Sequence, residues 1–483
     1  MSEDNKLYVF NDTETTGLNT WFSQIIQIGS VLSDENFEVL EELDISSKVL
    51  PWVVPTVGAY KVHKQIDSLD NNMSHHDMMT ILKDKWSEWS KEKNLIHVTY
   101  NGMKFDEELF RRQFYWNLYD PYMTNTNGAN RIDLMVIMMI IANFYSDQIN
   151  FPTDDDGKIK YKLELLAEKN GISAQNAHDA VVDCYLMINL LRVIKEKIPE
   201  VWNSAVLASS KAGCIELLNS EPFCMQGELY GGKKFTYPVV PCGQNPNNKN
   251  EIILADLYFD PKELFEMKDS ELKGQFGRSG AFKKIAINKT IPLINSKKIP
   301  NLSSFLDVPE KQLEERAKLI RENIDFQERV SSILGDNQFN WPAQEIVEQR
   351  IYDGFPSEAD KLWRDRFELA PWAEKVKLIE GFEDERYREL AERIVCYQKP
   401  EFASDEMIER FQSFVKTRLF SKGPWLKDRG QTLDQAIVEA ETLLAENNNE
   451  EDVEILEKLL DHYREKKLSL IHISEPTRRR GIS

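Results

Sequence analysis

The sequence predicts three successive domains: a mixed α/β domain, a β-rich domain and an α-helical domain. Up to about residue 197, strand-like apolar runs alternate with segments of helical periodicity. From about 200 to 340, short strand-like runs are broken by glycines and by Asn245-Pro246-Asn247-Asn248. From about 342 to 467, nearly every segment is helical in period and dense in charge. Since a chain of 483 residues is too long for one core, we expect domains at 6–197, 199–339 and 342–467.

The first domain begins with strand-like runs at 7–10, 25–32 and 37–40, close enough in sequence to form an antiparallel meander. A helix and another strand then follow, and four more helices complete the domain. The first of these helices is predicted at 74–91 and the strand at 95–100. The four later helices are predicted from residue 105 onward, at 131–145, at 162–169 and at 177–197. The acidic run at 154–156 is interpreted as a solvated turn rather than a metal site.

The ends and the cysteines exclude several classes of protein. The N-terminus has no signal-peptide pattern and no run of 18 apolar residues occurs, so we expect a soluble, cytoplasmic protein without membrane contact. The five cysteines are scattered without a C-x-x-C pair, which argues against a disulfide framework and a zinc site. Residues 468–483 break the acidic helical pattern and are interpreted as a non-native or disordered tail.

The charge balance limits where nucleic acid could bind. The formal charge of −20 disfavours binding over the whole surface. Residues 231–300, however, carry 12 Lys and Arg against 7 Asp and Glu, a net charge of 12 − 7 = +5. Any path for nucleic acid is therefore expected to be local.

Asp12 and Glu14 follow the apolar run at 7–10, and the period of two along a strand places both side chains on one face. Two adjacent carboxylates repel each other unless a cation or a shared proton lies between them. Oxygen ligands at positions i and i+2 of a rigid strand are suited to Mg²⁺ or Mn²⁺. Taken alone, such a pair is more often two ordinary surface acids at a solvated strand end.

Two further pieces could complete such a site. Asp106 follows the strand at 95–100 and lies in the first turn of a helix. Taken alone, an acid at this position can be no more than a helix cap. His178 and Asp183 would point about 140° apart on a regular helix. They can serve one site if His178 lies in the loop or first turn before the helix, and alone His178 could be a structural histidine.

The order Asp12, Glu14, Asp106, His178 and Asp183 resembles the DEDDh, or DnaQ-like, family of 3′→5′ exonucleases. Over about residues 6–467 the chain is similar to the bacterial exodeoxyribonuclease I branch of that family. The motifs that carry this similarity are Tyr-Asn-x-x-x-Phe-Asp at 100–106, Phe114-Tyr115, Tyr119-Asp120-Pro121-Tyr122, Asn170-Gly171-Ile172, Ile287-Asn288-Lys289 and Tyr352-Asp353-Gly354-Phe355. The resemblance implies a ribonuclease H-like exonuclease domain, an SH3-like barrel domain and a helical C-terminal domain.

The resemblance also implies a reaction. Asp12, Glu14, Asp106 and Asp183 would hold two Mg²⁺ ions, for which Mn²⁺ can substitute, and His178 would take a proton from the attacking water. Single-stranded DNA would be hydrolysed from its 3′ end to 5′-mononucleotides, in DNA repair and recombination.

Substrate contacts are expected by matching position to the family, through phosphate contacts and base stacking. They are Glu14, Arg111, Tyr122, Lys162, Asn250, Lys283, Asn288 and Tyr352. Two departures from the family stand out. Lys162 replaces an arginine, which keeps the charge but loses the bidentate fork, and the aromatic residue expected shortly after Tyr122 is absent from Thr124-Asn125-Thr126.

Two other functions compete with this interpretation. DEDDh exoribonucleases and polymerase proofreading exonucleases use the same five residues, and the catalytic core alone does not separate DNA from RNA. The two additional domains argue against a minimal ribonuclease or proofreading subunit. An inactive nucleic-acid-binding scaffold is disfavoured because all five residues are present.

A protein partner is implied as well. Members of the bacterial family bind the acidic C-terminal tail of single-stranded DNA-binding protein, and we expect this chain to do so as a monomer. An acidic tail needs a local basic cluster on a chain of net charge −20, and Lys297, Lys298, Lys311 and Arg316 are the candidates. These residues could equally be solvated surface cations.

Overall fold

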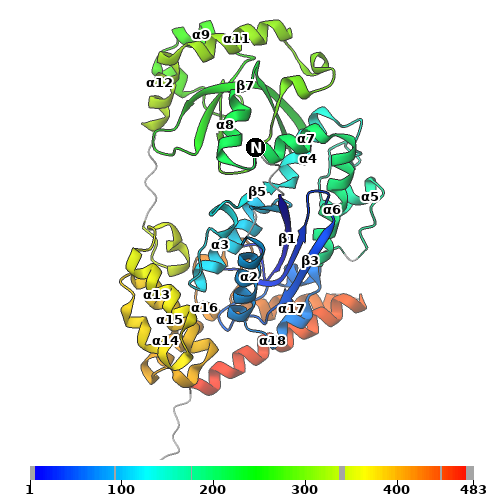
Figure 1. Ribbon diagram of the computed structural model, residues 1–483. Coiled ribbons are helices and arrows are strands. Elements are labelled where there is room, and N and C mark those ends of the chain that lie inside the picture. The colour runs from blue at the N-terminus through cyan, green and yellow to red at the C-terminus, as the bar shows by residue number, and fades with distance from the viewer. Residues whose placement is uncertain (1–5, 92–93, 176, 337–342, 447–448, 475–483) are drawn as a thin grey trace, which may run out of the picture.

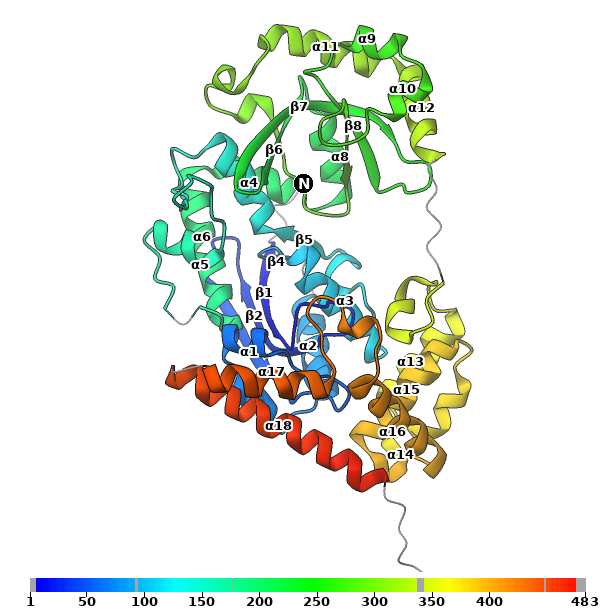
Figure 2. The same ribbon diagram turned by 180° about the vertical axis from the view of Figure 1, so that it is seen from behind.

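A computed structural model of the chain describes residues 6–91, 94–175, 177–336, 343–446 and 449–474. The chain forms three domains, and the second and third lie around the first (Figures 1 and 2). The second domain lies at one end of the first, and the helices of the third domain lie beside it and across its opposite end. No helix in the described part of the chain is long and apolar enough to cross a membrane.

The first domain contains a mixed five-stranded sheet of order β3-β2-β1-β4-β5. The predicted antiparallel meander β1-β2-β3 is confirmed, whereas β4 and β5 run parallel to β1. The strands are β1 Leu7–Thr15, β2 Ile25–Ser33, β3 Val39–Ser46, β4 Leu95–Thr99 and β5 Asn130–Asp133. The helices are α1 Val57–His63, α2 His75–Trp89, α3 Asp106–Trp116, α4 Leu134–Phe144, α5 Leu163–Lys169 and α6 Ala180–Lys197, with 3₁₀ turns η1 Ile66–Leu69, η2 Gly102–Lys104 and η3 Met123–Asn125.

Alternate residues of β1 enter two different hydrophobic cores. Tyr8 and Phe10 pack with residues of α4 and α6, whereas Leu7 and Val9 pack with residues of α2 and α3. Because side chains alternate along a strand, positions 12 and 14 continue the series of Tyr8 and Phe10. The sheet is therefore covered on both faces, and its first strand directs the two acids toward α6.

Three predicted elements have different limits in the structure. The single helix expected at 131–145 is divided into β5 and α4, because residues 130–133 pair with β4 before Asp133 caps the helix. The strand expected at 37–40 begins at Val39, since Phe37 has a positive φ of 64° in the preceding turn. The helix expected at 177–197 begins at Ala180.

The second domain contains a five-stranded antiparallel sheet of order β10-β6-β7-β8-β9. Its strands are β6 Cys224–Tyr230, β7 Lys233–Gln244, β8 Glu251–Asp256, β9 Phe282–Ala286 and β10 Leu293–Asn295. Its helices are α7 Pro199–Leu207, α8 Lys211–Asn219, α9 Pro261–Glu266, α10 Asp269–Lys273, α11 Glu310–Glu322 and α12 Ile324–Gly335, with 3₁₀ turns η4 Ser296–Lys298 and η5 Leu302–Phe305. The β-rich character predicted from the sequence is confirmed.

The third domain is helical throughout its described residues. Its helices are α13 Glu358–Leu369, α14 Trp372–Leu378, α15 Glu385–Gln398, α16 Asp405–Phe420, α17 Leu433–Glu446 and α18 Glu450–Ser474, with 3₁₀ turns η6 Val347–Tyr352, η7 Ile379–Gly381, η8 Pro400–Phe402 and η9 Pro424–Leu426. Helix α18 continues past residue 468, where the sequence pattern changes, and 475–483 lie outside the described residues. The exact domain limits predicted from the sequence stay predictions.

The first and third domains share one hydrophobic core. Ile26, Val57 and Tyr60 of the first domain pack with Leu456 and Tyr463 of α18 in a single cluster. The hydroxyl of Tyr463 also donates to the carbonyl of Pro55 at 2.6 Å. The helical domain is therefore built onto the first domain rather than connected to it only by the chain. All five cysteines are buried and free in the structure.

Candidate active site

The carboxylates of β1 lie where the strand meets the start of α6. Asp12 is paired with Gly29 of β2, and a Cβ atom at Gly29 would lie 2.4 Å from backbone atoms of Ala180. Only glycine therefore allows the first turn of α6 to approach β2 this closely. This close approach brings the residues before and within α6 to the face of β1 that carries Asp12 and Glu14.

His178 lies in the loop that leads into α6. This is the placement that allows it to share a site with Asp183, because on one regular helix the two side chains would point apart. The φ of 71° at His178 is unusual for a residue other than glycine and turns the chain sharply before the helix begins. Asp179 caps the helix by accepting from Val181 N, and ligand atoms of His178 and Asp183 lie within 4.8 Å of each other. The turn and the helix together hold His178 over Asp183.

Asp106 reaches the site from the opposite side of the sheet edge. After β4, Asn101 adopts a left-handed conformation, and the following 3₁₀ turn η2 leads directly into α3. Asp106 is the first residue of α3, and the hydroxyl of Thr13 donates to its Oδ1 at 2.6 Å. A side chain of β1 therefore fixes the carboxylate of α3.

The structure thus brings the five predicted catalytic residues to one end of β1, and three of them form a compact group. Single ligand atoms of Glu14, His178 and Asp183 all lie within 4.8 Å of one another. Asp106 is close enough to raise the pKa of both Asp12 and Glu14, although Asp12 and Asp106 fall outside that group of three. The arrangement offers hard oxygen ligands and one imidazole, which suits a divalent cation.

The electrostatics of this acidic cluster (Asp12, Glu14, Asp106 and Asp183) favour a cation further. Burial is the main cause that raises the pKa of each acid, to about 9 for Glu14, about 7 for Asp106 and about 6 for Asp183. The pKa of Asp12 is raised well above its usual value by burial and by its carboxylate neighbours. Ionising the whole acidic cluster is therefore unfavourable until positive charge is supplied. These residues fit a divalent metal site.

Three predicted substrate contacts lie together although they are far apart in sequence. Arg111 Nη1 donates to the hydroxyl of Tyr352 at 3.2 Å, and its guanidinium carbon lies 5.3 Å from the ring centre of Tyr122. The ring of Phe355 packs against Tyr122 at 5.9 Å and is 81% exposed. These accessible aromatic rings are suited to base stacking, and the guanidinium of Arg111 that lies among them also pairs with Glu108 at 3.2 Å.

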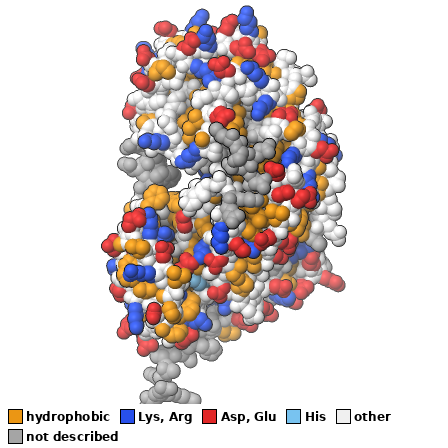
Figure 3. Space-filling view, in the orientation of Figure 1, with side chains coloured by type: hydrophobic (Ala, Val, Ile, Leu, Met, Phe, Trp, Pro, Cys, Tyr) orange, Lys and Arg blue, Asp and Glu red, His pale blue; other side chains and the backbone are white. Residues whose placement is uncertain are grey.

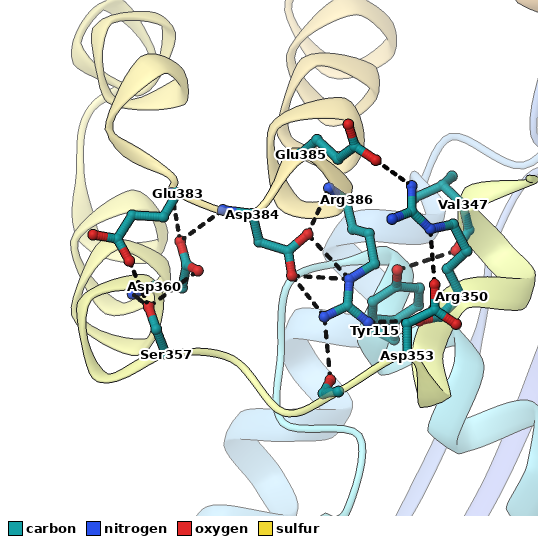
Figure 4. Close-up of polar contacts among 11 residues, drawn as sticks. Tyr115, Val347, Arg350, Asp353, Ser357, Asp360, Glu383, Asp384, Glu385 and Arg386 are labelled. Atoms are coloured by element: carbon teal, nitrogen blue, oxygen red, sulfur yellow. Dashed lines mark hydrogen bonds and ion pairs between the residues drawn. The ribbon is translucent and has the colours of Figure 1, made fainter. Parts of the chain in front are cut away.

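Polar contacts hold the segment that carries Tyr352 (Figure 4). Arg386 of α15 donates to the backbone carbonyl of Arg350 at 2.6 Å. The hydroxyl of Tyr115, on α3, donates to the carbonyl of Val347 at 3.0 Å. Helix α3 therefore begins at Asp106 and, further along, anchors the 3₁₀ turn that presents Tyr352.

The other predicted contacts are placed differently. Lys162 is exposed, 3.4 Å from Glu164, and Asn250 and Asn288 are partly buried in the second domain. Lys283 is only 8% exposed, and its ammonium group donates to the carbonyls of Arg278 and Gly280 at 2.5 and 2.8 Å. This corrects the expectation for Lys283, because its donors are committed to the protein rather than open to a phosphate.

The residues that support the acidic cluster are not among those predicted from the sequence. Thr13 positions Asp106, Gly29 admits α6, and Gln27 Nε2 donates to the capping carboxylate of Asp179 at 3.1 Å. All three lie on β1 or β2, beside the predicted acids. A glycine inside an otherwise apolar strand was the only signal, since it often marks a close backbone approach.

Three family models match successive parts of the chain. They are described as Exonuclease, over residues 9–191, Exonuclease I SH3-like domain, over 210–336, and Exonuclease I C-terminal domain, over 345–466. Among curated proteins, Exodeoxyribonuclease I of Escherichia coli (strain K12) is 27% identical over 370 residues, 73% of this chain and 77% of that protein. Exodeoxyribonuclease I of Haemophilus influenzae is 25% identical over 96% of this chain and 99% of that protein.

Solved structures show the same fold. Exonuclease I of E. coli in complex with a dA16 oligonucleotide is similar with a TM-score of 0.80 and 22% identity, over 95% of this chain and 100% of that one. A structure described as SSB/Exonuclease I in complex with the inhibitor CFAM is similar with a TM-score of 0.77 and 21% identity, over 95% and 99% of the two chains. The mixed sheet, the SH3-like domain and the helical C-terminal domain predicted from the sequence are thereby confirmed.

Proposed function

Since the chain belongs to the exonuclease I family, a family of nucleases, we propose that it hydrolyses single-stranded DNA from the 3′ end to 5′-mononucleotides. One observation carries the proposal. The four carboxylates of the acidic cluster and His178 converge where β1 meets α6 and α3. The named relatives, and the oligonucleotide in the structure of E. coli Exonuclease I, support DNA as the substrate.

Asp12, Glu14, Asp106 and Asp183 would hold two divalent cations, which we propose to be Mg²⁺. When bound, such ions stabilise the negative charge that develops on the phosphate oxygens during phosphodiester hydrolysis. The four acids have to be ionised to act as ligands, and their raised pKa values oppose ionisation of the cation-free protein. The residues of the acidic cluster are thus arranged for a charge that the protein does not itself provide.

His178 is the proposed general base. A ring nitrogen of His178 accepts a proton from the attacking water, which makes the water a stronger nucleophile toward phosphorus. Ligand atoms of His178 and Asp183 lie within 4.8 Å of each other, so the proposed base adjoins a proposed metal ligand. Arg111, Tyr122 and Tyr352 would hold the remaining nucleotides of the strand by stacking and phosphate contact.

Digestion of matched single strands tests the proposal. Single-stranded DNA and RNA of one sequence are incubated with the full chain and Mg²⁺, with chelator, and with either end blocked. We expect mononucleotides from DNA with a free 3′ end, and no product with chelator or with a blocked 3′ end. A preference for RNA would favour an exoribonuclease, and binding without digestion in Mg²⁺ and in Mn²⁺ would favour an inactive scaffold.

We also propose that the chain binds the acidic tail of single-stranded DNA-binding protein, as the family resemblance and the similar structure described as SSB/Exonuclease I suggest. Lys297, Lys298 and Lys311 are exposed, and Lys298 Nζ donates to Ser204 at 2.9 Å. Arg316, by contrast, donates to the carbonyls of Leu257 and Tyr258, so we remove it from the proposed basic cluster. Acidic and basic side chains are interspersed over the face in Figure 3, so a local cluster is needed.

A labelled peptide with the acidic tail sequence tests this partner. We expect binding that weakens steeply as salt rises, because charge interactions are screened beyond about 10 Å at 0.1 M ionic strength. Reversal of charge at Lys297, Lys298 and Lys311 together should abolish binding, whereas reversal at Lys158, which pairs with Asp156 at 2.9 Å, is the control. Equal affinity of the triple variant would refute the cluster. A role in DNA repair and recombination, in the cytoplasm and as a monomer, is proposed from the family resemblance alone.

A further inference from the structure

A short segment of the second domain contacts the first domain beside the acidic cluster. Residues 288–290 connect β9 to β10 and reach the strand β5 of the first domain. The backbone N–H of Asp133 donates to the hydroxyl of Thr290 at 2.7 Å, and Arg131 Nη2 donates to the carbonyl of Asn288 at 2.9 Å. Two hydrogen bonds therefore join the two domains within three residues of each other along β5.

The first bond continues toward Asp106 through the turn that precedes it. The carboxylate of Asp133 is buried and accepts from the backbone N–H groups of Asn101 and Met103, at 2.8 and 3.1 Å. These two N–H groups belong to the sharp turn between β4 and α3, where Asn101 is left-handed. Thr290 thus helps to orient Asp133, the residue whose carboxylate holds this turn.

The second bond continues toward Asp106 through α3 itself. Arg131 Nη1 lies 3.0 Å from Glu107 Oε2, and the hydroxyl of Thr124 donates to the same oxygen at 2.7 Å. Arg131 is 6% exposed and Glu107 is 2% exposed, so water contributes little to this ion pair. Glu107 follows Asp106 in the first turn of α3.

We propose that segment 288–290 of the second domain is a positioning element for the carboxylate of Asp106. Its two hydrogen bonds reach the turn before Asp106 and the residue after it, so they constrain Asp106 from both sides of the chain. A buried ion pair such as Arg131–Glu107 adds little net stability, whereas it can fix geometry. The inference rests on the proposed function, because it assigns Asp106 to the site of hydrolysis.

The physical reason for such an element is the sensitivity of metal sites to their supporting residues. Loss of a hydrogen bond that orients a ligand typically costs about 10- to 100-fold in metal affinity or activity. Thr13 gives Asp106 one direct hydrogen bond from within the first domain. The second domain would supply the rest of the constraint, which gives it a part in hydrolysis beyond any contact with DNA.

Thr290→Val is the sharpest test, since it removes the accepting hydroxyl and nearly keeps the shape. We expect the kcat for single-stranded DNA to fall about 10- to 100-fold, with KM unchanged, and calorimetric Mg²⁺ affinity without DNA to fall by a similar factor. Thr290→Ser keeps the hydroxyl and should restore both quantities. Wild-type kcat and Mg²⁺ affinity in Thr290→Val would overturn the proposal.

A second variant tests the other hydrogen bond. Arg131→Met with Glu107→Gln replaces the buried ion pair by neutral groups of similar size, and this leaves no uncompensated charge. We expect the same losses of kcat and Mg²⁺ affinity as in Thr290→Val, with thermal unfolding of the metal-free protein close to wild type. Wild-type values of both quantities in this double variant would refute the positioning element, as they would in Thr290→Val, and an inactive Asp12→Ala in the same assay would leave the proposed nuclease intact. A wild-type protein that digests no single strand would refute both.

Discussion

Two groups of buried carboxylates in this molecule are in opposite electrostatic situations. In the third domain, Glu348 is 2% exposed and forms ion pairs with Arg393, at 2.9 Å, and with Arg418. Burial opposes its ionisation, but the two guanidinium groups outweigh burial and lower the pKa of Glu348. In the acidic cluster of the first domain, burial and neighbouring acids raise every pKa instead.

The difference is the source of the positive charge. Glu348 has its cations built into the protein, so it is a structural group whose partners are always present. Among the described residues, no lysine or arginine forms an ion pair with Asp12, Glu14, Asp106 or Asp183. A buried charge without a protein partner is costly to stability and is typical of a functional site. The comparison can be tested by removing either kind of carboxylate.

The largest effect is expected from the acidic cluster. Asp12→Ala or Asp183→Ala should lower the rate of cleavage by at least on the order of 10² to 10³, because each removes a group that supports charge stabilisation. Affinity for single-stranded DNA should persist, since Arg111, Tyr122 and Tyr352 are unchanged. Rates are measured with excess Mg²⁺, and binding is measured by anisotropy with chelator. Turnover close to wild type in either variant would refute the metal assignment.

A variant of His178 tests whether this residue is the general base or a further metal ligand beside the acidic cluster. His178→Ala should lower kcat by about 10² to 10⁴, the usual contribution of a general base, and should retain Mg²⁺ binding in calorimetry. His76→Gln, a buried histidine of α2 whose ring Nδ1 lies 2.8 Å from Asn117 Oδ1, is a matched control. If His178→Ala lost Mg²⁺ affinity as strongly as Asp12→Ala, His178 would be a ligand rather than a base.

Glu348 should give the opposite result. Glu348→Ala leaves Arg393 and Arg418 without their shared partner, and a broken buried ion pair typically costs about 3 to 5 kcal/mol in the free energy of unfolding. The kcat measured well below the unfolding temperature should stay near wild type. Chemical denaturation gives the first quantity and the digestion assay gives the second. A stable but inactive Glu348→Ala would contradict the structural role.

The smallest effect is expected from metal binding on the stability of the folded protein and on its dependence on pH. In the absence of divalent cations, a raised carboxylate pKa means that the folded state retains protons that the unfolded state has lost. Stability should therefore fall as pH rises, through the pKa values of about 6 for Asp183, about 7 for Asp106 and about 9 for Glu14. Mg²⁺ at about 100 times its Kd should add about 2.7 kcal/mol and flatten this dependence.

Thermal unfolding between pH 6 and pH 9, with chelator and with Mg²⁺, measures this effect over the window set by Asp183, Asp106 and Glu14. Asp12→Asn removes one of the repelling charges, so it should stabilise the metal-free protein and weaken its response to Mg²⁺. A metal-free protein whose stability rises with pH over this range would contradict the proposed electrostatics.

The sequence predicts the acidic cluster better than its support. The period of two along β1 places Asp12 and Glu14 on one face, and the spacing of His178 and Asp183 allows one site only if His178 lies in the loop or first turn of the helix. These inferences need only local geometry. Thr13 and Gln27 cannot be predicted in the same way, because their partners are 93 and 152 residues away and only the folded sheet brings them together.

The fold shows the same limit. The long apolar runs of β1 and β2 are predicted correctly, whereas the pattern places β5 in a helix, since four residues are too few to show a period. The shared core of the first and third domains also cannot be predicted from sequence patterns. Ordinary helical periodicity shows that a face of α18 is buried, but not that Tyr60 and Pro55 lie beneath it.

The contact of Tyr463 with Pro55 has a consequence for synthesis on the ribosome. The two residues are 408 positions apart, so nearly the whole chain is translated before α18 can cover the apolar surface around α1. Domains generally fold in the order in which they emerge, and the first domain would wait with Val57 and Tyr60 uncovered. A chain interrupted before α18 would expose this surface to proteases. Such a truncated chain would still carry all five predicted catalytic residues.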